Sequence, residues 1–156
     1  MDIILAGQHD HQGCMSHALK TAEKICTAKG VRLTALRKRI LEIICTSHKA
    51  VGAYALLDIF KEEDPKAKPV TIYRALDFLM EAGLVHKIES LNAYIACMQA
   101  GNQHKTAILI CDVCSNAQEI DASAFYDGLF AASEAQAFSP DYLVLELHGR
   151  CVKCQH

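Results

Sequence analysis

The hydrophobic positions in the first half of the chain recur at helical spacing and predict four helices. The clearest helix begins at Pro69, and its apolar positions follow at i, i+4, i+7 and i+8. These positions are Ile72, Leu76, Leu79 and Met80. The same spacing predicts helices over residues 16–29, from Thr34 onward as an N-cap, and over residues 52–62. Each helix therefore has one apolar face to bury in a common core.

A hairpin is predicted directly after the last of these helices. Gly83 is expected to end the helix, and residues 84–88 and 94–96 are β-prone segments on either side of the polar turn Ser90-Leu91-Asn92. Short helices followed by a two-stranded hairpin form a winged helix-turn-helix, which places its last helix in the major groove of DNA. We expect such a domain over residues 1–96.

The second half of the chain has a different pattern. After a polar stretch that we interpret as a hinge, residues 97–105, the chain predicts three strands, one helix and two turns. These are strands 106–110, 117–121 and 142–147, a helix over 122–136, and turns at 111–116 and 149–154. Residues 106–156 are thus a small α/β domain, and the whole chain is α+β. So short a domain buries little apolar surface, so we expect a metal or a partner to stabilise it.

Two CxxC pairs carry the strongest chemical signal. Cys111 and Cys114 form the first pair, and Cys151 and Cys154 form the second. Two such pairs complete the tetrahedral four-sulfur set that structural zinc accepts. The alternative, a redox-active dithiol, prefers a CxxC that opens a helix, whereas these pairs fall in turns beside strands. We therefore predict a structural zinc site.

Four further potential ligands are dispersed: His86 and Cys97 at the two ends of the predicted hairpin, His104 in the hinge, and Glu119 on a later strand. Their spacing alone does not connect them, and an isolated His or Cys is more often a packed residue than a ligand.

The His- and Cys-containing stretch of residues 8–17 is interpreted as a solvated terminus, because short His tracts need a fold to give them ligand geometry.

Charge is divided unevenly along the chain. The formal net charge is −2, yet basic residues outnumber acidic ones up to residue 88 and acidic residues outnumber basic ones afterwards. The basic run 37–39 either contacts phosphates or is only a solvated face. Tyr73 and Arg74 lie near the start of the last predicted helix, where base edges are met. The alternative is that Tyr73 packs and Arg74 pairs with Asp77; we favour DNA contact.

Composition excludes some classes of protein. No apolar run approaches the length of a membrane span, and residues 3–6 are too short an apolar segment for a signal peptide, so a cytoplasmic protein is expected. A catalytic zinc site needs a position for water and a general base, and Glu119 acting as a fourth ligand would leave neither. We therefore expect no enzyme, although a zinc-stabilised protein-interaction module stays open.

The stretch KPVTIYRALDFLMEAGLVHKIESLNAYIAC, together with CDVC and CVKC, resembles the ferric uptake regulator (Fur) family and within it the zinc uptake regulator branch. The likeness runs from about Ala22 to Cys154. It implies a winged helix followed by a dimerisation domain, and a zinc-loaded homodimer that represses transcription by binding near-palindromic operator DNA.

The resemblance also implies roles for particular residues and two zinc ions per subunit. Regulatory zinc ligands fall on His86, Cys97, His104 and Glu119, structural ligands on Cys111, Cys114, Cys151 and Cys154, and DNA contacts on Tyr54, Tyr73 and Arg74.

One departure bears on the choice of metal. Iron and peroxide sensors of this family carry a His-rich run before the first CxxC, where this chain has Gln103-His104-Lys105-Thr106. A thiolate at Cys97 favours zinc, because soft sulfur does not suit a hard-oxygen iron site. A Fur-type regulator of another metal remains the alternative within the family.

Overall fold

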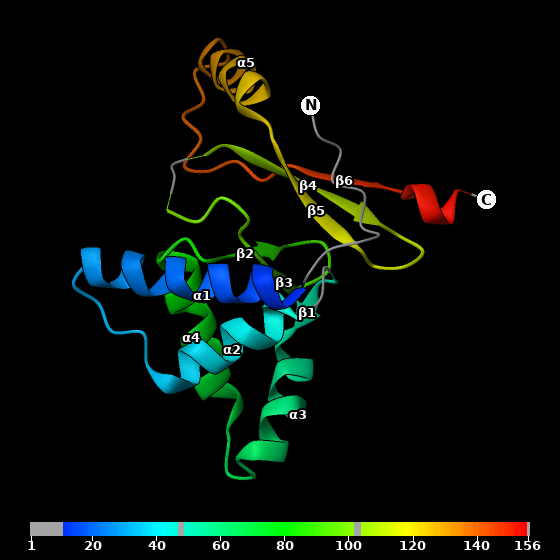
Figure 1. Ribbon diagram of the computed structural model, residues 1–156. Helices are drawn as coiled ribbons and strands as arrows, with labels where there is room; N and C mark the ends of the chain where they lie inside the picture. Colours follow the sequence, from blue (N-terminus) through cyan, green and yellow to red (C-terminus); the bar gives the residue numbers. More distant parts are fainter. Residues whose placement is uncertain (1–10, 47–48, 102–103, 156) are drawn as a thin grey trace.

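The computed structural model describes residues 11–46, 49–101 and 104–155 (Figure 1). The N-terminal part contains the helices α1 (His11–Ala28), α2 (Ala35–Cys45), α3 (Ala53–Glu63) and α4 (Pro69–Glu81), and the strands β1 (Val51–Gly52), β2 (Val85–Ile88) and β3 (Ala93–Ala96). The C-terminal part contains β4 (Thr106–Cys111), β5 (Ala117–Asp121), α5 (Ser123–Glu134), β6 (Glu146–Gly149) and the 3₁₀ turn η1 (Val152–Cys154).

Helices α2 to α4 lie where the hydrophobic spacing predicts them. The Thr34 hydroxyl accepts a hydrogen bond from the Arg37 N–H and so caps α2. Pro69 is the first residue of α4, where its missing N–H costs nothing. Gly83 ends α4 with a φ of 74°, and the Leu84 N–H bonds back to the Leu79 carbonyl. The apolar faces of the three helices meet in one core with fully buried Ile40, Ile44, Leu56, Ile72, Leu76 and Leu79.

The predicted hairpin is present and gains a third strand. β2 and β3 pair antiparallel with Lys87 opposite Tyr94, and the order of the sheet is β1-β3-β2. β1 was not predicted, because a strand of two residues is too short to show a hydrophobic period. The four helices and this small sheet make a winged helix.

Helix α1 corrects the interpretation of the N-terminal stretch. The predicted solvated terminus is helical from His11 onward, five residues before the predicted start at Ser16, while residues 8–10 lie outside the described part of the chain. No proline stops the helix there, so it continues beyond its buried stripe, which includes Ala22 and Cys26. Within the described residues, no helix is long and apolar enough to span a bilayer.

The C-terminal sheet has the order β5-β4-β6, with β4 antiparallel to β5 and parallel to β6. The predicted strand 142–147 is wrong in position, because β6 begins only at Glu146 and runs to Gly149. Tyr142 and Val144 are exposed. The position of β6 is set by its pairing with β4, which runs from Ile108 beside Glu146 to Cys111 beside Gly149. The β-prone composition of the residues before Glu146 does not decide it.

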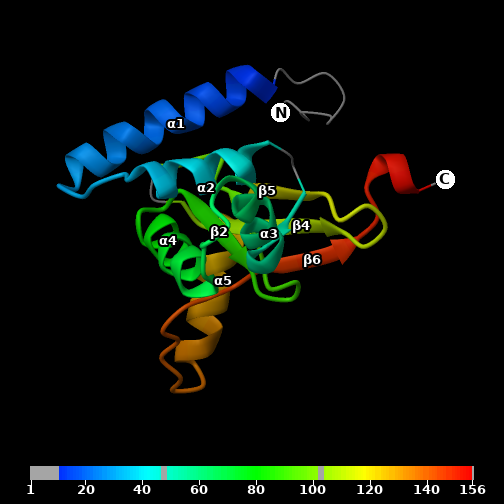
Figure 2. The ribbon, with the colours of Figure 1, turned by 90° about the horizontal axis from the view of Figure 1, so that it is seen from below.

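The hairpin packs against the C-terminal sheet through a separate apolar cluster. Ile88 and Ile95 of the hairpin are buried together with Ile108, Ile110 and Ala117 of β4 and β5. Figures 1 and 2 show this sheet lying against the hairpin, while α5 projects away from the rest of the molecule. The winged helix and the C-terminal sheet therefore share an apolar interface at the hairpin.

We expect Ile88→Ala to weaken this interface. Ile88 is completely buried, so its truncation should lower the free energy of unfolding by about 2 to 5 kcal/mol. Urea denaturation measures the change. The matched control is Leu91→Ala in the adjoining turn, where the side chain is 42% exposed and the change should stay within about 0.5 kcal/mol. Equal stability of the two variants would contradict the interface.

Candidate metal centres

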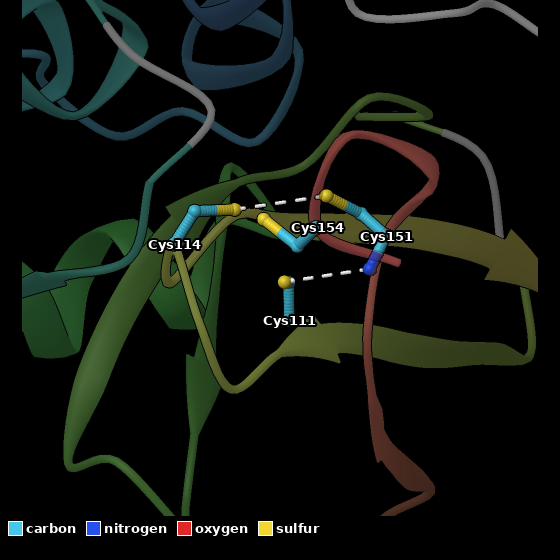
Figure 3. A group of neighbouring side chains, drawn as sticks. All are labelled: Cys111, Cys114, Cys151 and Cys154. Carbon is cyan, nitrogen blue, oxygen red and sulfur yellow. Dashed lines mark hydrogen bonds between the residues drawn. The ribbon is translucent and has the colours of Figure 1, made fainter. Parts of the chain in front are cut away.

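The four CxxC cysteines meet at one end of the C-terminal sheet. Parallel pairing of β4 with β6 places Cys111 beside Gly149, two residues before Cys151. The other two cysteines lie in the turn after β4 and in η1. All four sulfur atoms lie within 4.8 Å of one another and point toward a common centre (Figure 3). The structure thus brings together the complete set predicted for structural zinc.

Backbone turns hold these cysteines in place. The Ser115 N–H donates to the Cys111 carbonyl, with Ser115 in the left-handed region, and the Cys154 N–H donates to the Cys151 carbonyl, each at 2.8 Å. None of the cysteines whose side chains the structure describes is in a disulfide. Sγ of Cys114 lies 3.7 Å from Sγ of Cys151, a non-bonded contact. The arrangement is a converging thiol set rather than two dithiol pairs.

Backbone N–H groups prepare one of these thiols for a cation. The Cys151 N–H donates to Sγ of Cys111 at 3.4 Å, and such bonds lower the pKa of the Cys111 thiol to about 6. The neighbouring sulfur atoms instead raise the pKa of Cys154 to about 12, with the side chain of Cys151 the largest cause. Four negative thiolates cannot crowd together without a cation, and this donor set fits zinc.

The dispersed set also comes together. His86 lies on β2, Glu119 on β5, and Cys97 and His104 lie on the segment that joins the two sheets. Their ligand atoms also lie within 4.8 Å of one another. Nε2 of His104 is 2.6 Å from Oε1 of Glu119 and 3.5 Å from Sγ of Cys97, and Nε2 of His86 is 3.3 Å from the same Oε1. The cluster spans the interface between hairpin and C-terminal sheet.

Two buried polar atoms of this cluster lack a hydrogen-bond partner: Nε2 of His86 and Oε1 of Glu119. The two atoms lie 3.3 Å apart, an ion-pair contact that needs a protonated imidazole. The Glu119 side chain is only 1% exposed, and its other oxygen accepts the Met98 N–H at 2.9 Å. Unpaired buried polar atoms are costly, and a cation bound between them would satisfy both. The residues therefore fit a divalent metal.

The electrostatics of the cluster favour a cation as well. Burial raises the pKa of Glu119, but His86 and the Met98 N–H outweigh it and lower the pKa to about 2, so the carboxylate is charged. Burial, and then the charge of Glu119, raise the pKa of the Cys97 thiol to about 12. A soft cation that binds here must displace the thiol proton.

The predicted DNA contacts lie on the helical part of the fold. Tyr54 on α3 is 67% exposed. Arg74 on α4 is exposed, and among the described residues no ion pair joins it to Asp77. Tyr73 is half-buried and packs against the core, which agrees with the alternative that this side chain has a packing role. Arg74 is thus presented outward on the helix predicted to enter the groove.

The basic run 37–39 is engaged within the fold. The Arg37 guanidinium lies 3.5 Å from the centre of the Phe78 ring. Lys38 pairs with Glu23 at 2.8 Å, and Arg39 pairs with Glu42 and Glu63. These contacts support the interpretation of the run as a solvated face rather than a phosphate-binding one.

Sequence reasoning did not single out Glu146 and His148. Both lie on β6, and both contact the hairpin turn. Residues two apart on a strand face the same side of the sheet, so a correctly placed β6 would have predicted that the two side chains share a face. The strand was predicted at residues 142–147, and this relation was therefore missed.

The candidate metal site takes His86 from the hairpin of a winged helix, Cys97 and His104 from the joining segment, and Glu119 from the sheet beside it. This arrangement defines a metal-dependent winged-helix protein. The profile of the Ferric uptake regulator family matches residues 28–146, and the chain belongs to this family.

Relatives within the family are similar over most of their length. The chain is 42% identical over 137 residues to the zinc uptake regulation protein of Escherichia coli (strain K12), covering 87% of this chain and 80% of that protein. It also superposes on a zinc uptake regulator in complex with zinc and DNA with a TM-score of 0.83 and 38% identity, covering 94% of this chain and 95% of the other.

Two structures of one further relative differ in how well they match. The holo form of XcZur superposes with a TM-score of 0.81 at 41% identity, covering 89% of this chain and 96% of that one. The apo form of the same protein gives only 0.54 at 39% identity, with coverage of 92% and 99%. The arrangement described here is therefore more similar to the holo form of that protein than to its apo form.

Proposed function

We propose that this protein is a zinc-responsive transcriptional repressor that binds operator DNA as a zinc-loaded homodimer and controls genes of zinc uptake. The observation that carries the proposal is the cluster of four potential ligands that joins the hairpin of a winged helix to a second sheet: His86, Cys97, His104 and Glu119. Two of its buried polar atoms have no hydrogen-bond partner. Support comes from a similar zinc uptake regulator whose structure holds zinc and DNA, and from the similar zinc uptake regulation protein of Escherichia coli.

Each subunit is proposed to hold two zinc ions with different tasks. Cys111, Cys114, Cys151 and Cys154 form a closed four-sulfur site that is structural. The second cluster combines one thiolate, two imidazoles and one carboxylate from both sides of an interface. A divalent cation held by all four of these groups would stabilise the arrangement in which the hairpin lies on the C-terminal sheet. This second cluster is the proposed regulatory site.

The domain division follows from this assignment. Residues 1–96 form the DNA-binding winged helix, residues 97–105 the hinge and residues 106–156 the dimerisation domain. Helix α5 buries none of its residues, and large apolar side chains stay exposed around it: Phe125, Leu129, Phe138, Tyr142, Val144 and Leu147. So much exposed apolar surface in one part of a chain supports an interface with a second copy.

In a two-fold dimer, the angle between winged helix and dimerisation domain sets the distance between the two α4 helices. Only one distance matches successive half-sites of a near-palindromic operator. Zinc that binds this arrangement more tightly than an open one raises operator affinity, typically by about 5- to 150-fold. Tyr54, Tyr73 and Arg74 are the proposed DNA contacts.

The function is tested by selecting duplexes from a random-sequence DNA pool with the purified dimer, with and without added zinc. The proposal expects enrichment of a near-palindromic sequence only with zinc, and weaker binding as salt rises. No enrichment in zinc would contradict it and favour the protein-interaction module, whereas enrichment with iron or manganese but not zinc would assign another metal.

Two cysteine variants should separate the two sites. Cys97→Ala is expected to keep the dimer and the tight ion but to lose the exchangeable zinc, and with it the zinc response of DNA binding. Cys111→Ser is expected to lose the structural ion and the dimer, because a closed zinc site contributes folding free energy. Native mass spectrometry counts zinc and subunits in both variants.

The outcomes of this experiment discriminate between the assignments. An unchanged zinc response of Cys97→Ala would remove Cys97 from the regulatory site. A normal dimer of Cys111→Ser would contradict the structural site.

Arg74→Ala is expected to weaken binding to the selected duplex by about 1 to 3 kcal/mol and to relax selectivity at one base position, because an Arg on the recognition helix can pair bidentately with guanine. Fluorescence anisotropy measures the loss. The matched control is Arg39→Ala, whose guanidinium already pairs with Glu42 and Glu63. Equal losses for both variants would indicate a general charge effect and contradict the assignment of Arg74.

A further inference from the structure

The C-terminal sheet presents two glutamates in one row toward the hairpin. Ile108 on β4 is opposite Glu119 on β5 and opposite Glu146 on β6. Residues directly opposite each other in a sheet share a face. Ile108 is buried against Ile88 and Ile95 of the hairpin, so the two glutamates flank the apolar contact. Glu119 belongs to the regulatory cluster, but nothing yet assigned uses Glu146.

The Glu146 carboxylate binds the backbone of the hairpin turn. Its Oε1 accepts the Glu89 N–H at 2.6 Å, and its Oε2 accepts the Ser90 N–H at 3.2 Å. The side chain is only 11% exposed. Two consecutive N–H groups on one ionised carboxylate are charge-assisted hydrogen bonds, which are stronger than neutral ones. The turn is therefore held at the end of the hairpin opposite to the regulatory ligands.

His148 adds a second connection one step along the same face. Its Nε2 lies 3.0 Å from the Ser90 hydroxyl and its Nδ1 lies 2.8 Å from a carboxylate oxygen of Asp112. Asp112 stands between the two cysteines of the first CxxC, and its N–H donates to the Gly149 carbonyl. The hairpin turn is thus connected through β6 to the four-cysteine site.

The order Ser90, His148 and Asp112 has the connectivity of a serine-hydrolase triad, but its surroundings do not suit catalysis. Ser90 is exposed and Asp112 is 56% exposed, whereas oxyanion stabilisation depends on a water-excluded site. The Ser90 N–H, which would have to serve a reacting group, already donates to Glu146. The arrangement is a structural connection.

We propose that Glu146, supported by His148, is a positioning residue that holds the hairpin in the DNA-binding arrangement without contacting zinc or DNA. The proposal rests on the proposed function and adds a second, metal-independent anchor to it. In an open arrangement water would satisfy the N–H groups of Glu89 and Ser90, so these contacts stabilise only the closed one. Zinc at the regulatory site and the operator are both proposed to bind the closed arrangement. Contacts that stabilise this arrangement therefore raise the affinity for both ligands together.

Amide hydrogen exchange of the zinc-loaded dimer, without DNA, tests the anchor directly. The Glu89 and Ser90 amides should be protected in the wild type and should exchange about tenfold faster or more in Glu146→Ala, since losing hydrogen bonds to a charged group removes their protection. The matched control is Glu89→Ala, which removes a carboxylate from the same turn but leaves both N–H groups in place, so the Ser90 amide should stay protected. Equal exchange in the wild type and Glu146→Ala would overturn the proposal.

Binding measurements on the same variants test the consequence. Glu146→Ala should keep the dimer mass and the tight zinc ion, yet lose about five- to tenfold in affinity both for regulatory zinc and for the selected duplex. Glu146→Gln, whose amide oxygen can still accept one N–H, should lie between the wild type and Glu146→Ala, and it carries the test if the alanine variant does not fold. Loss of operator affinity at unchanged zinc affinity, or no loss of either, would contradict the anchor.

The two proposals can fail separately. If the wild-type dimer selects no duplex in zinc, the proposed function fails, while the exchange and zinc measurements still decide whether Glu146 holds the hairpin. If the wild type selects a duplex and Glu146→Ala binds it equally well, only the anchor fails.

Discussion

The parallel pairing of β4 with β6 builds both the four-cysteine site and the sheet face on which the hairpin lies. β6 is a four-residue edge strand whose last three residues are exposed, so packing alone does not hold it. The two CxxC pairs lie at its end, and a closed metal site there can supply roughly 10 to 16 kcal/mol, comparable to the stability of a whole domain. Once β6 is in register, it completes the sheet face that receives the hairpin.

The hairpin then serves both parts of the molecule. Its residues close the winged helix, and Ile88 and Ile95 are buried against the C-terminal sheet. Near its open end, His86 lies 3.3 Å from Glu119 in the proposed regulatory cluster, and at its turn the backbone N–H of Glu89 donates to Glu146. Because α4 leads directly into β2, whatever fixes the hairpin on the sheet also fixes the recognition helix. The proposed coupling between metal binding and DNA binding therefore runs through the contact between hairpin and sheet and needs no long path.

The sequence predicted helices α2 to α4 and strands β2 to β5 closely, but it missed the start of α1, the strand β1 and the position of β6. Local residues mark the ends of helices, such as the Thr34 cap, Pro69 and Gly83, so the bounds of α2 to α4 were predicted closely. The start of β6 depends on pairing with β4, which no local pattern encodes. The spacing of the two CxxC pairs was enough to predict their metal site. The other four ligands come together only in the tertiary fold, so they were connected by family resemblance: His86, Cys97, His104 and Glu119. The ion-pair partners of Lys38 and Arg39 lie on α1, α2 and α3, and Arg37 lies against Phe78 of α4. Charge patterning alone could not reveal which of these contacts form.

Binding of the second metal is proposed to close the hairpin onto the C-terminal sheet. Small-angle X-ray scattering can compare the dimer fully loaded with zinc and the dimer after mild chelation that removes only the exchangeable ion. We expect the loaded dimer to scatter as a dimer of the arrangement described here, and the chelated dimer to keep its mass but to have a larger radius of gyration or a changed distance distribution. Identical scattering curves from the two dimers would contradict it.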